Sequence, residues 1–305
     1  MPLHIHTPLI ESRPLSLSAG RPVWLKLEAL QPCGSFKLRG VGHACEVHHA
    51  QGARHFVSSS GGNAGLAVAY AGRKLGVPVT VVVPETTTER AKELLRLEDA
   101  TVVVHGSSWQ EANERAQSLL GPGDAFIHPF DDPLLWAGHA SMIDEVAAAG
   151  LKPDAVVLSV GGGGLLCGVV EGLQRNGWHD VPVLAVETDG AASLHAAMAA
   201  GHTVELPRIA SVATSLGAKR VAEQALECTR QHPVHSHLVS DRDALEACER
   251  LLLDHRVLVE PACGAALALL QRPEVLAPYA NVLVIVCGGA TATVEQIRTW
   301  LEQTA

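Results

Sequence analysis

Residues 155–168 read AVVLSVGGGGLLCG, an apolar run followed by four consecutive glycines and a second apolar run. The first run lacks the alternation of polar and apolar residues and is rich in valine, which is typical of a parallel strand buried on both faces. Four successive glycines are costly to order, and they are expected where a backbone wraps closely around a ligand. The order strand, glycine turn, helix indicates an α/β fold.

The same order of elements recurs along the chain. The predicted strands cover residues 23–27, 55–57, 79–83, 101–104, 125–128, 155–160, 181–186 and 282–286. The predicted helices cover residues 63–75, 88–97, 110–119, 134–148, 165–174 and 294–301, and a capping box of Ser240 and Asp243 opens another that runs to about residue 253. Repeated strand–helix units predict parallel twisted sheets with right-handed crossovers and helices on both faces.

Composition narrows the class of protein. The chain has 305 residues, of which 47% are hydrophobic and 18% charged, so it can bury one large core or two modest ones. A formal charge of −9 gives no basic footprint for nucleic acid, and no apolar run reaches membrane-spanning length. The seven cysteines are scattered without a CxxC pair, which favours reduced thiols and a cytoplasmic protein.

Ligands of open parallel sheets bind beyond the carboxyl ends of the strands, so the segments there carry the candidate site. Lys37 follows a turn at Gly34 and Ser35 and begins a predicted helix. The helix dipole disfavours the charged form of its amine, and a neutral amine is what Schiff-base chemistry requires. Taken alone, however, Lys37 is more typical of a surface lysine at a helix start.

The loop SSSGGNAG at 58–65 follows the strand at 55–57 and opens a helix. Its small residues let backbone N–H groups approach an anion such as a substrate carboxylate, and the helix dipole attracts the same charge. Asn63 has two interpretations, a donor to the ligand or a simple helix cap, and the sequence leaves both open.

The glycines at 161–164 suit a phosphate. A dinucleotide is an alternative, since Glu187 ends the next predicted strand, where an acid would bind a ribose. The pattern GxGxxG is not met, however, because its third position is Leu166 or Cys167. Cys287, which precedes two glycines at the end of the last predicted strand, is on its own most typical of a small buried hydrophobic residue.

Together, SFKLRG at 35–40, SGGNAG at 60–65, GGGG at 161–164 and CGG at 287–289 resemble the pyridoxal-phosphate enzymes of the tryptophan-synthase-β type, or fold type II. The resemblance is strongest to the L-serine dehydratases of animal type, which are related to the threonine dehydratases. It extends over nearly the whole chain, from TPL at 7–9 to VEPACGAA at 259–266.

This resemblance implies two domains with the cofactor in the cleft between them. The large domain would comprise residues 1–37 and 138–305, and the small domain residues 38–137. Lys37 would hold the cofactor as a Schiff base, Phe36 would pack against one face of the pyridine ring, and Cys287 would face its nitrogen. The phosphate would be bound by Gly161, Gly162, Gly163, Gly164 and Leu165.

The resemblance also implies how the substrate and a cation are bound. Ser60, Gly61, Asn63 and Ala64 would bind the substrate carboxylate, and Asn63 would also hydrogen-bond the hydroxyl oxygen of the cofactor ring. A monovalent cation such as K⁺ would be held by the backbone oxygens of Gly161, Ala191, Leu216 and Ala218 and by the Glu187 carboxylate.

The implied reaction is the elimination of water and ammonia from L-serine or L-threonine, and the implied assembly is a homodimer. Gly61 stands where serine racemases of this fold have a serine that acts as a second base, which argues against racemisation and predicts extra room. Three alternatives remain: an NAD-dependent dehydrogenase, a protein that holds the cofactor without catalysis, and a β-replacement enzyme on the same scaffold.

Overall fold

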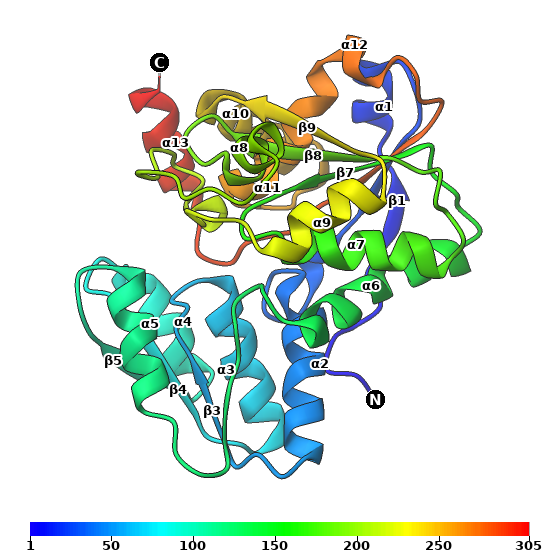
Figure 1. The fold of residues 1–305 in the computed structure, drawn as a ribbon. Helices are drawn as coiled ribbons and strands as arrows, with labels where there is room; N and C mark the ends of the chain where they lie inside the picture. The colour runs from blue at the N-terminus through cyan, green and yellow to red at the C-terminus, as the bar shows by residue number, and fades with distance from the viewer. Residues whose placement is uncertain (305) are drawn as a thin grey trace.

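Two separate β-sheets organise the molecule, and the computed structural model describes them over residues 1–304 (Figure 1). The six-stranded sheet has the order β1 (Leu9–Glu11), β2 (Val23–Lys26), β10 (Val282–Ile285), β7 (Ala155–Ser159), β8 (Val183–Thr188), β9 (Val234–Val239). The four-stranded sheet has the order β5 (Thr101–Val104), β4 (Val79–Val83), β3 (His55–Ser58), β6 (Asp124–Phe126). Every neighbouring pair is parallel except β1 with β2.

Helices cover both faces of the sheets, as predicted. They are α1 (Arg13–Ala19), α2 (Lys37–Ala50), α3 (Asn63–Leu75), α4 (Glu89–Leu97), α5 (Trp109–Ser118), α6 (Pro133–Ala148), α7 (Gly164–Arg175), α8 (Ser193–Ala200), α9 (Glu223–Gln231), α10 (Asp241–His255), α11 (Pro261–Ala268), α12 (Pro273–Leu276) and α13 (Val294–Gln303). In β3, Phe56 packs in the core that α2 and α3 cover, whereas Val57 packs with Ala112 and Ala116 of α5. Successive strand residues point to opposite faces, so these contacts place α3 and α5 on opposite sides of the sheet.

The α/β fold class is confirmed, and all eight predicted strands are present within two residues at each end. The helix after Ser240 begins with the predicted capping box. The sequence analysis missed β1, which has only three residues, and β9, whose sequence VHSHLV places two histidines on one face. It also missed several helices, among them α8, α9 and α11. The division into residues 38–137 against 1–37 and 138–305 stays a prediction.

Among residues 1–304, no helix is long and apolar enough to cross a membrane. All seven cysteines are free thiols with buried side chains. The core of the six-stranded sheet is built mainly from alanine, valine and leucine, as the low aromatic content of the sequence requires.

A buried ionic network anchors the first turn of α2, where Lys37 lies. The guanidinium of Arg39 donates to Glu28 at 2.7 and 2.8 Å and to Glu145 at 2.7 and 2.8 Å. Lys26 on β2 also donates to Glu145, and Arg39, Lys26 and Glu28 have no exposed surface. The network therefore ties α2 to α6 and to the six-stranded sheet, because its members come from all three.

Replacing Arg39 with Ala should destabilise the protein by about 3–5 kcal/mol, because Glu28 would keep a buried charge without its main partner. Urea unfolding measures this change. Arg242, which pairs with Glu246 on the exposed face of α10, is the matched control, and Arg242→Ala should cost less than about 1 kcal/mol. Equal losses for the two variants would contradict the anchoring role of the network.

Candidate active site

Two backbone hydrogen bonds join the segment before α2 to the segment after β10. The Phe36 N–H donates to the Cys287 carbonyl at 3.0 Å, and the Gly289 N–H donates to the Gly34 carbonyl at 2.9 Å. Gly288 has a φ of +97°, and a Cβ there would lie 2.3 Å from the Gly34 oxygen, so the close approach requires glycine. The pairing places Lys37, the next residue, beside the carboxyl end of β10.

Lys37 is half-buried and begins α2, as predicted. Its Nζ donates to the Pro129 carbonyl at 2.6 Å and lies 5.1 Å from the centre of the Phe36 ring. Burial lowers the pKa of the Lys37 amine from 10.5 to about 8, although the nearby Cys287 acts in the opposite direction. Lys37 thus differs from a fully exposed lysine, and its role at the site stays a prediction.

The four glycines lie between β7 and α7, at the helix N-terminus. The peptide N–H groups of Gly162, Gly163, Gly164 and Leu165 donate to no acceptor within residues 1–304. Gly163 has a φ of +95°, and a Cβ at Gly162 would lie 2.3 Å from the Phe130 ring. The loop thus holds a row of free donors at the positive end of a helix dipole, where a phosphate or another anion binds.

Cys287 lies two residues after the end of β10, and Ser159 ends the neighbouring parallel strand β7. Their Sγ and Oγ atoms lie 3.6 Å apart, and both side chains are buried. A thiol and a hydroxyl thus lie at the carboxyl edge of the sheet, next to the start of the glycine loop.

Ser60 and Gly61 lie in the loop between β3 and α3, and Ala64 lies in the first turn of α3, in the four-stranded part of the fold. The N–H groups of Gly61, Asn63 and Ala64 have no acceptor in the part of the chain that the structure describes. The N-cap of α3 is Gly62, and the Asn63 side chain makes no capping bond. Instead, its amide donates to Glu260 and accepts from the Ala290 N–H, each at 3.0 Å. Asn63 is therefore not a simple helix cap.

Gly61 does not leave the extra room that the sequence suggested. A Cβ there would lie 2.8 Å from Cγ2 and 3.0 Å from Oγ1 of Thr87, and 3.1 Å from Val83. Thr87 follows β4 in a turn and already occupies the space that a side chain at position 61 would need. Any larger residue at that position must displace Thr87.

Five residues are predicted to hold a cation. Glu187 lies near the end of β8, and Gly161 and Ala191 lie in the loops that follow β7 and β8. Leu216 ends a short 3-10 turn, and Ala218 follows that turn. A Cβ at Gly161 would lie 2.9 Å from the Leu216 Cα, so these two backbones are in contact. The Ala218 N–H donates to the Leu216 carbonyl at 2.8 Å, and the Ala191 N–H donates to Thr188 at 2.9 Å.

Glu187 is buried, and its carboxylate accepts the N–H groups of Leu194 and His195 at 2.8 Å each. Burial raises the pKa of Glu187 to about 7. Cation binding by this set of residues stays a prediction.

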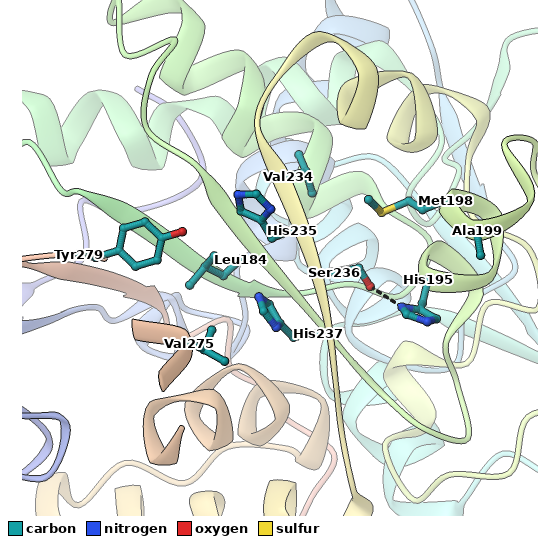
Figure 2. A pocket seen from close by; sticks show the side chains of 10 residues that line it. All are labelled: Leu184, His195, Met198, Ala199, Val234, His235, Ser236, His237, Val275 and Tyr279. Atoms are coloured by element: carbon teal, nitrogen blue, oxygen red, sulfur yellow. Dashed lines mark hydrogen bonds between the residues drawn. The ribbon is translucent and has the colours of Figure 1, made fainter. Parts of the chain in front are cut away.

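A cavity of about 620 Å³ lies elsewhere, along the edge strand β9 (Figure 2). His235 and His237 line it together with Tyr279, Met198 and Val275. None of the residues predicted for the site lines this cavity, so we do not assign the chemistry to it.

A family model described as pyridoxal-phosphate dependent enzyme matches residues 1–288. The chain belongs to this family. The human protein named L-serine dehydratase/L-threonine deaminase is 51% identical over 99% of this chain and 96% of its own length. The human protein named serine dehydratase-like is 52% identical over 94% of this chain and 91% of its own.

The fold agrees with these sequence matches. The crystal structure of a fungal L-serine ammonia-lyase from Rhizomucor miehei superposes with a TM-score of 0.95 at 35% identity, covering all of both chains. Threonine deaminase isoform 2 from Solanum lycopersicum superposes with a TM-score of 0.90 at 26% identity, over 99% of this chain and 93% of its own. The family and its fold are thus confirmed, and the dinucleotide alternative loses its support.

The residues present fit a pyridoxal-phosphate cofactor. A partly buried amine with a lowered pKa suits its aldehyde, and the row of free N–H groups at 162–165 suits its phosphate. Phe36 offers a ring face beside Lys37, and Cys287 lies at the adjacent strand end. The individual roles of these residues stay predictions.

The sequence analysis assigned no role to Glu260, which accepts from Asn63 at this site, or to Ser215 and Thr291, which both donate to Glu260. One feature of the sequence could have identified Glu260 as a buried residue of the site. It lies within the otherwise apolar segment LVEPACGAA, where a lone acidic residue is expected to be buried and hydrogen-bonded.

The lowered pKa of Lys37 predicts the pH dependence of its reactivity. Only the neutral amine acylates, so the labelling rate of Lys37 in the apoprotein should rise with pH, reach half of its maximum near pH 8, and then level off. An N-hydroxysuccinimide ester followed by peptide mass spectrometry measures this rate. A rate that keeps rising towards pH 10.5 would show that burial does not shift this amine.

Proposed function

We propose that this protein is an L-serine ammonia-lyase that also accepts L-threonine, and that it forms pyruvate or 2-oxobutanoate together with ammonia. The observation that carries the proposal is the Lys37 amine, whose pKa is lowered to about 8 and which lies beside Cys287. The names of relatives about half identical to this chain over nearly their whole length support the choice of substrates.

Pyridoxal phosphate, when bound, withdraws electrons from the substrate α-carbon and so makes its proton easier to remove. Lys37 would carry out the proton transfer as the general base. A general base works best with a pKa near the working pH, and burial brings the amine close to that range. The Pro129 carbonyl, which accepts from Lys37 Nζ at 2.6 Å, would hold the amine in place between steps.

The substrate carboxylate would bind to the free N–H groups of Gly61, Asn63 and Ala64. These donors lie at the N-terminus of α3, whose dipole favours a negative charge. Because Gly61 has no side chain, this loop offers no second base on the opposite face of the substrate. The proposal is therefore elimination from L-amino acids rather than racemisation.

Replacing Lys37 with Ala should abolish turnover, with a loss of at least about 10²–10⁴-fold, because the general base is removed. A coupled assay of pyruvate formation from L-serine measures this loss. Lys152→Ala, which removes a lysine paired with Asp180 on the surface, should keep full activity. Pyruvate formation by Lys37→Ala, or a reaction confined to D-amino acids, would refute the assignment.

We also propose that a monovalent cation such as K⁺ binds near the glycine loop, to the backbone oxygens of Gly161, Ala191, Leu216 and Ala218 and to Glu187. The support is the contact between Gly161 and Leu216 and the buried Glu187 carboxylate, which has no Lys or Arg nitrogen within 4 Å among residues 1–304.

Exchange of K⁺ for tetramethylammonium should lower the rate of pyruvate formation, since the larger ion cannot be coordinated closely. Restoration of the rate by added K⁺ is the control for damage during the exchange. Equal rates in the two salts would contradict this cation site.

We also propose that the protein forms a homodimer and is located in the cytoplasm. Twofold symmetry is the commonest arrangement of soluble oligomers. Seven buried free thiols are typical of a reducing compartment.

A further inference from the structure

Glu260 carries a buried carboxylate that lies between the two sheets of the fold. It is only 4% exposed and is the N-cap residue of α11, but its side chain makes no capping bond to that helix. Four donors reach it instead: Asn63 Nδ2 (3.0 Å) and Ser215 Oγ (2.5 Å) donate to Oε2, and Thr291 N (3.1 Å) and Thr291 Oγ1 (2.6 Å) donate to Oε1.

No Lys or Arg nitrogen lies within 4 Å of this carboxylate in residues 1–304, so its partners are all neutral. Burying a charge is costly unless hydrogen bonds satisfy it. A carboxylate has about four acceptor sites, and here four donors occupy them. An apolar side chain of the same volume would leave these four donors without an acceptor, which is also costly, so the carboxylate both satisfies its donors and fixes their directions.

The donor that matters most is Asn63, because its amide could otherwise rotate by half a turn. Glu260 accepts from Nδ2, and the Ala290 N–H donates to Oδ1, so both ends of the amide are fixed. A primary amide has two N–H donors, and only one is used here. The second N–H therefore remains free, in a fixed direction, for a ligand.

The hydrogen bond from Asn63 to Glu260 joins the two parts of the fold. Asn63 begins α3, which packs on the four-stranded sheet, whereas Glu260 directly precedes α11, which packs on β7 and β8 of the six-stranded sheet. We propose that Glu260 is a positioning residue that fixes the orientation of Asn63, and with it the loop at 60–64, relative to Lys37 and the glycine loop. This inference rests on the proposed function, because that function makes the loop at 60–64 the binding site of the substrate carboxylate.

The variant Glu260→Gln tests the chemistry of the carboxylate without changing its shape. The Gln amide nitrogen would face either the Thr291 N–H or Asn63 Nδ2, and two donors would then meet. If Asn63 rotated to relieve the contact, its own Nδ2 would face the Ala290 N–H. Either arrangement leaves a buried donor unpaired, which is costly.

The first measurement is hydrogen exchange of the apoprotein, followed by mass spectrometry. In Glu260→Gln the peptides that cover 59–66 and 288–293 should exchange about ten times faster or more, while the strands of both sheets keep their protection. The double variant Glu260→Gln with Asn63→Asp should regain protection, because the Gln amide can then donate to the new carboxylate. Glu246→Gln, on the exposed face of α10, is the matched control and should leave exchange unchanged.

The second measurement is steady-state kinetics of the holoenzyme with L-serine. Glu260→Gln should raise KM roughly ten-fold or more and change kcat less, because a disordered loop weakens binding of the carboxylate. Unchanged exchange at 59–66, or faster exchange spread evenly over the chain, would overturn the positioning role. If the wild type forms no pyruvate, the proposed function fails, but the exchange data still decide whether Glu260 orients Asn63.

Discussion

The backbone pairing of residues 34–36 with residues 287–289 is the constraint on which the rest of the site depends. It joins the start of α2 to the carboxyl end of β10, although these segments are some 250 residues apart in sequence. Because the strands of the sheet are parallel, β7 ends at the same edge, and the glycine loop follows it there. One pair of hydrogen bonds thus brings an amine, a thiol and a row of free N–H groups together.

The four-stranded part of the fold supplies a second group of free N–H donors, which the six-stranded sheet lacks. The loop at 60–64 belongs to the four-stranded sheet, and its free N–H groups reach the site at the N-terminus of α3. The Arg39 network holds α2 against α6, and Glu260, whose side chain lies close to Gly289, holds Asn63. Buried carboxylates therefore connect different elements of the fold at two places. In the Arg39 network their partners are cations, whereas the partners of Glu260 are neutral donors.

Much of this arrangement could be predicted from sequence, because it is encoded locally. Valine-rich runs mark the buried strands, and the helix starts at Lys37 and Asn63 follow from small residues and turns that precede them. The partners of Glu260 could not be predicted in this way. Asn63 and Glu260 are separated by 197 residues, and nothing in either segment shows that the two side chains meet. The space near Gly61 was misjudged for the same reason, since Thr87 comes from a different turn.

The central claim is that the Lys37 amine carries the cofactor. Reduction of the holoenzyme with borohydride, digestion and peptide mass spectrometry test this claim most directly, because reduction makes the bond to the cofactor permanent. We expect the mass of the reduced pyridoxyl phosphate on the peptide that contains Lys37 and on no other. The same mass on a different lysine, or a holoenzyme that yields no labelled peptide, would contradict the account.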